Sequence, residues 1–339
     1  MIPLQGSAGI FGPSCELCAE LATLELNARA GLLGREVRLQ VVDGGRVPAQ
    51  VADEVDALVS AGTVDAVAGW HISAVRQALA PRLAARVPYI YTALYEGGER
   101  SPGVFLTGET PGEQLLPALR WLAQELGVRR WAVVGNDYVW PRASAAAVRC
   151  SAAACGVEVG TEVFVPLGCE DFSPVLARIQ RCGCDGLLML LVGEDAVRFN
   201  RQFAQAGLDE LVRLSPLMDE NMLLATGAAS TRGIYAAAGY FEALPTPGSL
   251  DFSARFARLF GTEAPVLNSL GESCYEGIAL LAELAQRAGS LEVAALEAVA
   301  PQVSYESPRG RVRLRGRHLQ QDVYLARADG VDFDVLCTL

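Results

Sequence analysis

The sequence predicts an α/β protein with two lobes, each a doubly wound parallel sheet, and three observations support this fold class. At 339 residues the chain exceeds the size of a single typical domain core. Segments of strand and helix character alternate up to about residue 238. Near-continuous apolar strands such as 187–192 are typical of sheets that helices cover on both faces.

The order of the expected elements suggests how the chain divides into domains. Ser14 is expected to cap a first helix that ends at Gly31. Strands are expected over 37–41, 64–69 and 87–92, with helices over 51–59, 73–85 and 112–126. After residue 238, helices over 249–260 and 270–288 precede short strands. We therefore expect lobe 1 to comprise 1–108 plus 239–305, and lobe 2 to comprise 109–238 plus 306–339.

Composition and charge narrow the class of protein. Hydrophobic residues make up 51% of the chain and charged residues 20%, which is ample for well-packed cores. The net charge of −11 opposes direct binding to nucleic acid. No apolar run reaches the roughly 18–20 residues of a membrane span, and no export signal is visible at the start. We expect no membrane insertion.

The nine cysteines indicate in which cellular compartment the protein resides. An exported protein of this size is expected to have few cysteines or paired ones, so the sequence favours reduced thiols in the cytoplasm. A periplasmic or extracytoplasmic location remains the alternative if a leader was removed. Cys15 and Cys18 share the spacing of a metal or redox site but have no partner pair, so buried thiols are the better interpretation. We expect no metal and no cofactor.

The junction 133–142 is the most informative part of the chain. An apolar strand ends in Gly-Asn-Asp, and Pro141 stands at the start of a helix, where free backbone N–H groups face outward. Tyr138 and Trp140 stand beside these donors, as aromatic walls do around a small polar ligand. The alternative is that both rings only pack against the edge of the strand.

Four further loops follow strand ends, where ligands bind in open α/β sheets. Their candidate ligand-binding residues are His71 and Ser73, Tyr91 and Ala93, Gly193, and Met218 and Asp219. Simpler roles stay open, because Ser73 and Asp219 could merely cap helices and His71 could be a hydrogen-bonded loop residue.

These loops, in this order, resemble the type I periplasmic-binding-protein family. The resemblance is carried by 42–45, by Gly69 to Pro81, by 95–97 with 101–102, and most specifically by 136–142, with later matches at 271–275 and 310–314. Within the family it is strongest to the amide- and urea-binding branch, which includes a cytoplasmic amide sensor and the binding proteins of urea transporters.

The resemblance implies two lobes joined by three hinge crossovers that close on a ligand in the cleft between them. It implies that His71, Ser73, Tyr91, Ala93, Tyr138 and Trp140 contact the ligand. Two positions depart from the amide sensor, because Ala93 replaces a threonine and His71 replaces a tyrosine or tryptophan. A lost hydroxyl that bonds a buried amide costs about 1–3 kcal/mol, so acetamide is not a safe assignment.

Two functions remain open. The preferred one is a cytoplasmic ligand sensor that passes lobe closure to a regulator protein, and the alternative is the extracytoplasmic substrate-binding protein of an ABC importer with a permease partner. An enzyme is disfavoured, because the chain has two histidines and no catalytic triad spacing, phosphate-binding loop or metal cluster. No catalytic residues are therefore assigned. Oligomeric state is left open.

The ligand class is open as well. A neutral amide or urea-like molecule is preferred. Glu194, Asp195, Asp219 and Glu220 in the last two loops could instead bind the ammonium of an amino acid or amine, as a carboxylate near Asp219 does in amino-acid-binding relatives.

Five arginines recur at alternate positions in 309–317. On an extended strand all five would project from one face. A solvated edge strand is one interpretation, and a docking surface for an acidic partner is the other.

Overall fold

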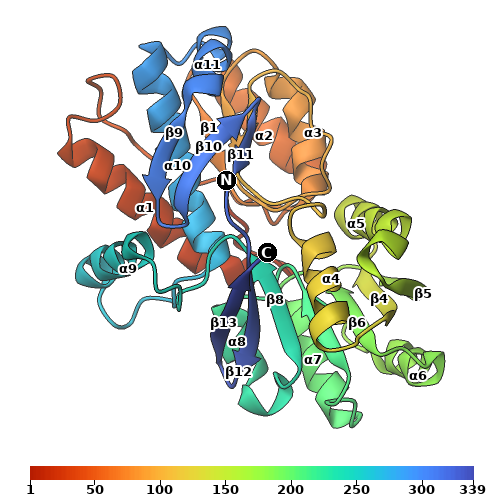
Figure 1. Cartoon of the computed structure of the whole chain (residues 1–339). Helices are drawn as coiled ribbons and strands as arrows, with labels where there is room; N and C mark the ends of the chain where they lie inside the picture. Colours follow the sequence, from red (N-terminus) through yellow and green to blue (C-terminus); the bar gives the residue numbers. More distant parts are fainter. The chain divides into compact units, whose positions relative to one another are not determined.

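The computed structural model describes residues 1–339, which form two compact units. Unit 1 comprises Met1–Leu94, Gly98–Gly108 and Leu244–Asp322, and unit 2 comprises Tyr95–Gly97, Glu109–Ala243 and Val323–Leu339. Each unit has a parallel-dominated sheet with helices packed on it, which confirms the predicted α/β class (Figure 1). None of the helices is both long and apolar enough to span a bilayer.

Unit 1 is built on a six-stranded sheet of order β1-β2-β3-β11-β10-β9. Its strands are β1 (Val67–Gly69), β2 (Tyr89–Tyr91), β3 (Val104–Leu106), β9 (Ser304–Ser307), β10 (Gly310–Arg315) and β11 (His318–Gln320). Strands β1, β2, β3 and β11 are parallel to their neighbours in this series, whereas β10 is antiparallel to both β11 and β9. The expected strands 64–69 and 87–92 are thus present in shortened form.

The helices of unit 1 bury one face each against this sheet or against one another. They are α1 (Gly12–Ala28), α2 (Pro48–Ser60), α3 (Ser73–Leu83), α9 (Pro247–Phe260), α10 (Ser269–Ala288) and α11 (Val293–Val299), with 3-10 turns η1 (Gly9–Phe11) and η4 (Ala300–Gln302). Leu280 and Leu284 of α10 pack with Ile90 and Phe105 of the sheet in one buried cluster. Asn268 caps α10 by accepting a hydrogen bond from the Gly271 N–H at 2.7 Å.

Unit 2 is built on a seven-stranded sheet of order β13-β12-β8-β7-β6-β4-β5. Its strands are β4 (Arg130–Asn136), β5 (Glu158–Val165), β6 (Gly186–Leu190), β7 (Val212–Ser215), β8 (Ile234–Ala238), β12 (Tyr324–Asp329) and β13 (Asp332–Thr338). The five strands from β5 to β8 are parallel, and β12 and β13 complete the sheet in antiparallel pairing.

The helices of unit 2 alternate with its parallel strands, with the first helix before β4 and each later helix after a parallel strand. They are α4 (Leu115–Glu125), α5 (Val139–Ser151), α6 (Ser173–Cys182), α7 (Glu194–Gln205) and α8 (Glu220–Thr226), with 3-10 turns η2 (Ala153–Cys155) and η3 (Ala228–Ser230). Every residue of β6 is buried, as expected for a strand that helices cover on both faces.

The expected domain boundaries differ from the structure near the C-terminus. Residues 306–322, which the sequence predicts to lie in lobe 2, belong to unit 1 in the structure. Strands β9, β10 and β11 form an antiparallel meander, and β11 pairs with β3 through His318 and Leu106. This pairing holds the segment to the sheet of unit 1. The chain is expected to return to lobe 1 near residue 239, and in the structure unit 1 resumes at Leu244.

Two local expectations were wrong. Ser14 does not cap α1, since the helix begins at Gly12, and the Ser14 hydroxyl donates to the Phe11 carbonyl at 3.1 Å. Residues 37–41 do not form a strand. A cavity of about 550 Å³ is lined both by residues 37–40 and by residues 64–69, which include β1. Alternation alone cannot make a strand where no neighbour supplies a ladder.

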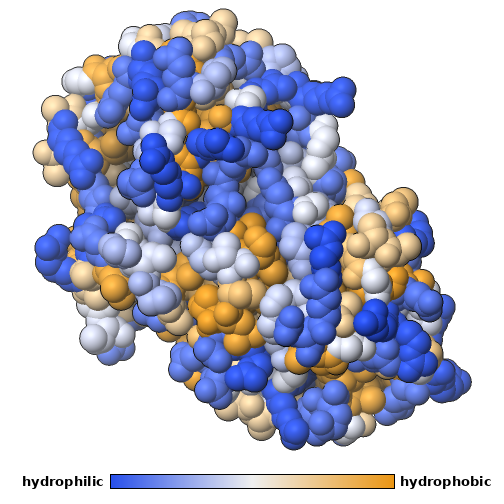
Figure 2. All heavy atoms as spheres, viewed as in Figure 1, coloured by the Kyte–Doolittle hydropathy of each residue, from blue (hydrophilic) through white to orange (hydrophobic).

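The row of arginines is not an edge strand with one charged face. Strand β10 lies between β9 and β11, so its backbone is paired on both sides. Arg311, Arg313 and Arg315 are exposed, whereas Arg309 is 1% exposed and Arg317 is partly buried. The surface over this meander is largely hydrophilic, as the blue spheres in the upper part of Figure 2 show. The expected row of five exposed arginines on one face is therefore limited to three exposed side chains.

Candidate functional site

Unit 1 brings four of the predicted residues together, and we call His71, Ser73, Tyr91 and Ala93 the first half-site. Strands β1 and β2 are parallel, and Gly69 pairs with Tyr91 at their ends. The loops that carry His71 and Ala93 therefore leave the sheet side by side. Gly69 has a φ of +134°, and a Cβ there would lie 2.0 Å from the Met1 carbonyl oxygen, so glycine is required at this strand end.

The polar groups of the first half-site are connected. The Tyr91 hydroxyl donates to the His71 carbonyl oxygen at 2.8 Å, and the Ser73 hydroxyl lies 3.5 Å from the same tyrosine oxygen. All three residues are buried. Because the two loops hold each other, the Ser73 hydroxyl has a fixed position at the first residue of α3. Ile72, and not Ser73, is the N-cap of that helix, so capping does not explain this serine.

His71 is a neutral, structurally engaged side chain. Its Nε2 lies 2.8 Å from the Tyr89 hydroxyl, and its ring is 4.9 Å from the Tyr91 ring between centroids. Burial lowers the pKa of His71 to about 3. The imidazole thus contributes a neutral hydrogen-bonding surface and does not change charge near pH 7.

Arg76 adds a buried charge beside the first half-site. It lies one turn into α3, its guanidinium is 5.1 Å from the centroid of the Tyr91 ring, and its Nε donates to a Glu99 carboxylate oxygen at 3.1 Å. The side chains of this ion pair are 3% and 10% exposed. Sequence reasoning assigned no role to Arg76 or Glu99, because their pairing joins segments 23 residues apart.

Unit 2 brings the other five predicted residues to one edge of its sheet. We call Tyr138, Trp140, Gly193, Met218 and Asp219 the second half-site. They follow β4, β6 and β7, which are adjacent and parallel, so their carboxyl ends meet. The rings of Tyr138 and Trp140 are tilted, with centroids 6.3 Å apart. Trp140 is 3% exposed, whereas Tyr138 is only partly buried.

A buried network fixes the loops after β4 and β6. The Asn136 side chain accepts from the Val192 N–H at 2.8 Å and donates to the Asp195 carboxylate at 2.7 Å. Asp195 also accepts from the Gly168 N–H at 2.9 Å. Gly193, between these groups, has a φ of +49°, which residues with a side chain rarely adopt. Asn136 therefore positions the second half-site, a role that its place in the motif alone did not reveal.

The acidic residues of these loops have different roles. Asp195 is engaged by the network, and Glu194 forms an exposed ion pair with Arg198 at 2.6 Å. Asp219 caps α8, since its Oδ1 accepts from the Met222 N–H at 2.8 Å. Its Oδ2 is buried without a hydrogen-bond partner. Asp219 is thus both the helix cap and the carboxylate of the second half-site with a free acceptor.

The electrostatics of Asp219 and its neighbour follow from burial. Burial raises the pKa of Asp219 to about 7. Burial, and then the charge of Asp219, raise the pKa of Glu220 to about 8. Near neutral pH these carboxyl groups are largely or partly protonated, so the second half-site carries little net charge in the unliganded protein.

Hydrogen bonds to Met218 and from Gln114 hold the loop after β7, and sequence reasoning missed Gln114. The Met218 sulfur accepts from Asn200 at 3.8 Å, and Asn200 in turn accepts from the buried Arg213 at 2.6 Å. The Gln114 side chain donates to the Pro216 carbonyl oxygen at 2.9 Å. Nothing in local sequence indicates Gln114, because its partner is 102 residues away.

The first half-site supplies hydroxyl and imidazole groups, and the second supplies carboxyl and aromatic groups, each fixed within its own unit. No group of three His, Cys, Asp or Glu side chains is arranged to hold a metal ion. Such a set of groups can bind a small polar molecule by hydrogen bonds and ring contacts.

The fold and these strand-end loops define a solute-binding protein. Residues 1–332 match the family model of periplasmic binding proteins, and the chain belongs to this family. It is 27% identical over 297 residues to "Leu/Ile/Val-binding protein homolog 6" of Brucella melitensis biotype 1, covering 83% of this chain and 75% of that protein.

Solved structures share the fold. A solute-binding protein of an ABC transporter from Rhodopseudomonas palustris BisB5, in complex with 3,4-dihydroxybenzoic acid, has a TM-score of 0.87 at 24% identity, covering 100% of this chain and 95% of that chain. The branched-chain amino acid transporter substrate-binding protein LivJ from Streptococcus pneumoniae, in complex with isoleucine, has a TM-score of 0.88 at 17% identity, covering 100% and 97%. These structures confirm the type I periplasmic-binding-protein fold.

Proposed function

We propose that this protein is the extracytoplasmic substrate-binding protein of an ABC importer, with no catalytic activity, and that it delivers a small polar ligand to a permease. The proposal rests on the family membership of residues 1–332 and on relatives described as substrate-binding proteins of ABC transporters. Ligand binding stabilises the form of the protein that the permease recognises.

We further propose that the ligand is a neutral short amide or urea-like molecule. The observation that carries this step is the Oδ2 of Asp219, which is buried without a hydrogen-bond partner and, in the ionised carboxylate, accepts from an N–H donor. Ser73 and the N–H groups at the start of α3 supply donors for the carbonyl oxygen of the ligand.

Charge balance favours a neutral ligand over an amino acid. In the first half-site His71 is neutral, and Arg76 is paired with Glu99. Neither half-site contains a free cationic side chain to balance a ligand carboxylate. Burying an unbalanced carboxylate is costly, whereas an amide needs only neutral partners.

Thermal-shift screening tests the ligand class. The panel contains acetamide, propionamide, urea, isoleucine, 4-hydroxybenzoate and butylamine. A ligand at 100 times its dissociation constant adds about 2.7 kcal/mol to stability. We expect amides or urea to stabilise the protein, and Asp219→Asn to reduce the effect while it keeps the helix cap. Stabilisation by amino acids or aromatic acids alone would overturn the amide assignment and retain the binding function.

A cytoplasmic sensor is the second candidate function, because none of the nine cysteines forms a disulfide in the structure. Fractionation of cells that express the native gene separates the two candidates. Recovery outside the cytoplasm together with the permease supports the importer. Recovery in the cytoplasm with a regulator protein supports the sensor.

A further inference from the structure

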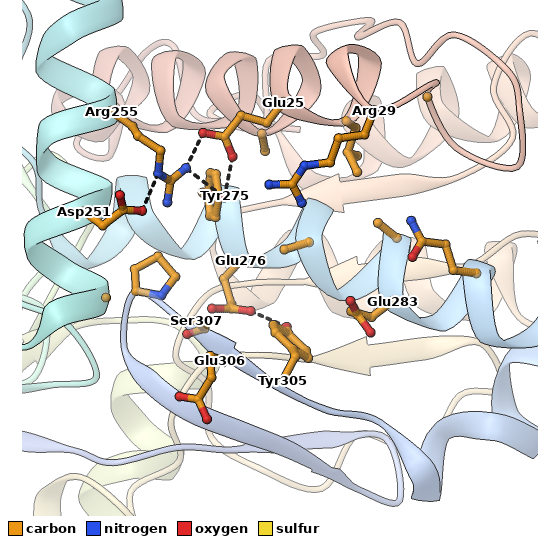
Figure 3. Close-up of a pocket in the computed structure, with 18 residues that line it drawn as sticks. Glu25, Arg29, Asp251, Arg255, Tyr275, Glu276, Glu283, Tyr305, Glu306 and Ser307 are labelled. Atoms are coloured by element: carbon orange, nitrogen blue, oxygen red, sulfur yellow. Dashed lines mark hydrogen bonds and ion pairs between the residues drawn. The ribbon is translucent and has the colours of Figure 1, made fainter.

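Unit 1 contains a second cavity that shares no residue with the first half-site. Its volume is about 370 Å³, and it is lined by α1, α9, α10 and the segment of β9 and Pro308 (Figure 3). Helix α10 packs on β1 and β2. The α10 residues that line the cavity include Tyr275, Glu276, Ala279 and Glu283, which recur at helical spacing.

Glu276 is the central feature of this cavity. The residue is 0% exposed, and its Oε1 accepts a hydrogen bond from the Tyr305 hydroxyl. Its Oε2 is buried without any hydrogen-bond partner. In Figure 3 the Glu276 side chain extends from α10 into the space above β9, toward Tyr305. A buried carboxylate oxygen without a donor is costly and calls for a partner from outside the chain.

The charges around the cavity show which partner fits. Five carboxylates and two guanidinium groups line it: Glu25, Asp251, Glu276, Glu283 and Glu306, and Arg29 and Arg255. Arg255 does not balance Glu276, because it forms ion pairs with Glu25 and, at 2.8 Å, with Asp251. Arg29 is exposed. The lining therefore has more carboxylates than guanidinium groups. Glu283 pairs with Arg287 at 3.6 Å and Glu306 lies 4.0 Å from Arg311, whereas Glu276 has no ion-pair partner.

Aromatic and apolar groups of the lining add a surface for an organic body. Tyr275 and Tyr305 line the cavity from opposite sides together with Ala22, Leu26 and Ala279. Aromatic faces attract ammonium and guanidinium groups. A metal ion fits poorly, because no group of three ligating side chains is arranged for one.

We propose that this cavity binds a small organic cation, an alkylammonium or guanidinium compound whose N–H groups donate to the free Oε2 of Glu276. The alkyl part of the ligand packs against Tyr275 and Ala279. The acidic side chains Glu283 and Glu306 at the cavity attract the cation and stabilise a second amine where the ligand has one. This site is independent of the ligand class of the two half-sites.

Isothermal titration calorimetry with 1,4-diaminobutane tests the proposal, with 1,4-butanediol as the uncharged probe of equal length. We expect the diamine to bind at millimolar concentration or below and the diol not to bind. Glu276→Gln should weaken binding by about tenfold or more. The matched control is Glu16→Gln, an exposed glutamate of α1 outside the cavity, which should bind like the wild type.

Two further variants keep the test decisive if Glu276→Gln folds poorly. Ala279→Leu fills part of the cavity without touching the carboxylate and should also weaken diamine binding. Asp219→Asn alters the second half-site and should leave it unchanged. Absence of diamine binding, equal binding by Glu276→Gln and Ala279→Leu, or loss of binding in Asp219→Asn would each overturn the proposal.

Discussion

Arg309 and Glu272 form an ion pair inside unit 1, with side chains that are 1% and 0% exposed. Arg309 also donates to the Gln321 side chain at 2.6 Å and to the Thr107 carbonyl oxygen at 3.4 Å. The pair thus joins α10, the end of β3 and the segment after β11. Removing one member of a buried pair leaves the other charge unbalanced.

Arg309→Leu is therefore expected to lower the free energy of unfolding by about 3–5 kcal/mol, measured by urea denaturation. Arg313→Ala, in the same row of arginines but exposed, is the control and should change it by about 0.5 kcal/mol or less. Equal effects of the two substitutions would show that the buried pair has no special role.

Trp140→Ala is expected to weaken ligand binding by about 2–4 kcal/mol, as truncation of a buried aromatic anchor does. Calorimetry with the best ligand of the thermal-shift panel measures the change. Trp121→Ala, on α4 away from the strand-end loops, is the control and should retain full affinity. An unchanged affinity in Trp140→Ala would remove the tryptophan from the site.

Stability should fall with rising pH because of Asp219. Its pKa is 3.8 in the unfolded chain and about 7 in the folded protein. Between these values the folded state holds a proton that the unfolded state has released, so stability is full below about pH 4 and is lost as pH rises through 7. Asp219→Asn should remove this loss, by up to about 1.4 kcal/mol per pH unit. Parallel pH profiles for wild type and variant would contradict the assignment.

Backbone amides of residues 38–41 should exchange with solvent at rates close to those of an unfolded peptide. The structure records no hydrogen bond from these N–H groups, whereas the neighbouring Val37 N–H donates to Asn27 at 2.8 Å. Hydrogen exchange followed by mass spectrometry or NMR measures this contrast. Slow exchange at 38–41 would indicate that the segment is paired as a strand in solution.

All nine thiols should react with a thiol reagent in protein purified under mild reducing conditions, because none of the nine cysteines forms a disulfide in the structure. Titration with a thiol reagent in denaturant gives the count. The same titration on protein recovered from its native compartment is informative about location, since an oxidising compartment favours disulfides. A stable bridge would contradict the prediction and favour an extracytoplasmic origin.

Local pattern determined the two-lobed α/β class and the position of the loops proposed to bind the ligand. Short apolar runs such as 187–192 are typical of buried strands, and the carboxyl ends of neighbouring parallel strands share one edge of a sheet. For that reason Tyr138, Trp140 and Asp219 could be grouped before their contacts were known. Helices with clear periodicity, such as α9 and α10, were placed within a few residues of their observed ends.

Tertiary structure alone decided which of these residues are engaged and which are free. The sequence could not separate Asp195, which is used by Asn136, from Asp219, which keeps a free oxygen, because each is one acidic residue after a strand. It could not show that Arg309 is buried while Arg313 is exposed, or that residues 37–41 lack a partner. Which side chains are buried or hydrogen-bonded depends on contacts between segments that are distant in the sequence, because burial and hydrogen bonding depend on neighbours in space.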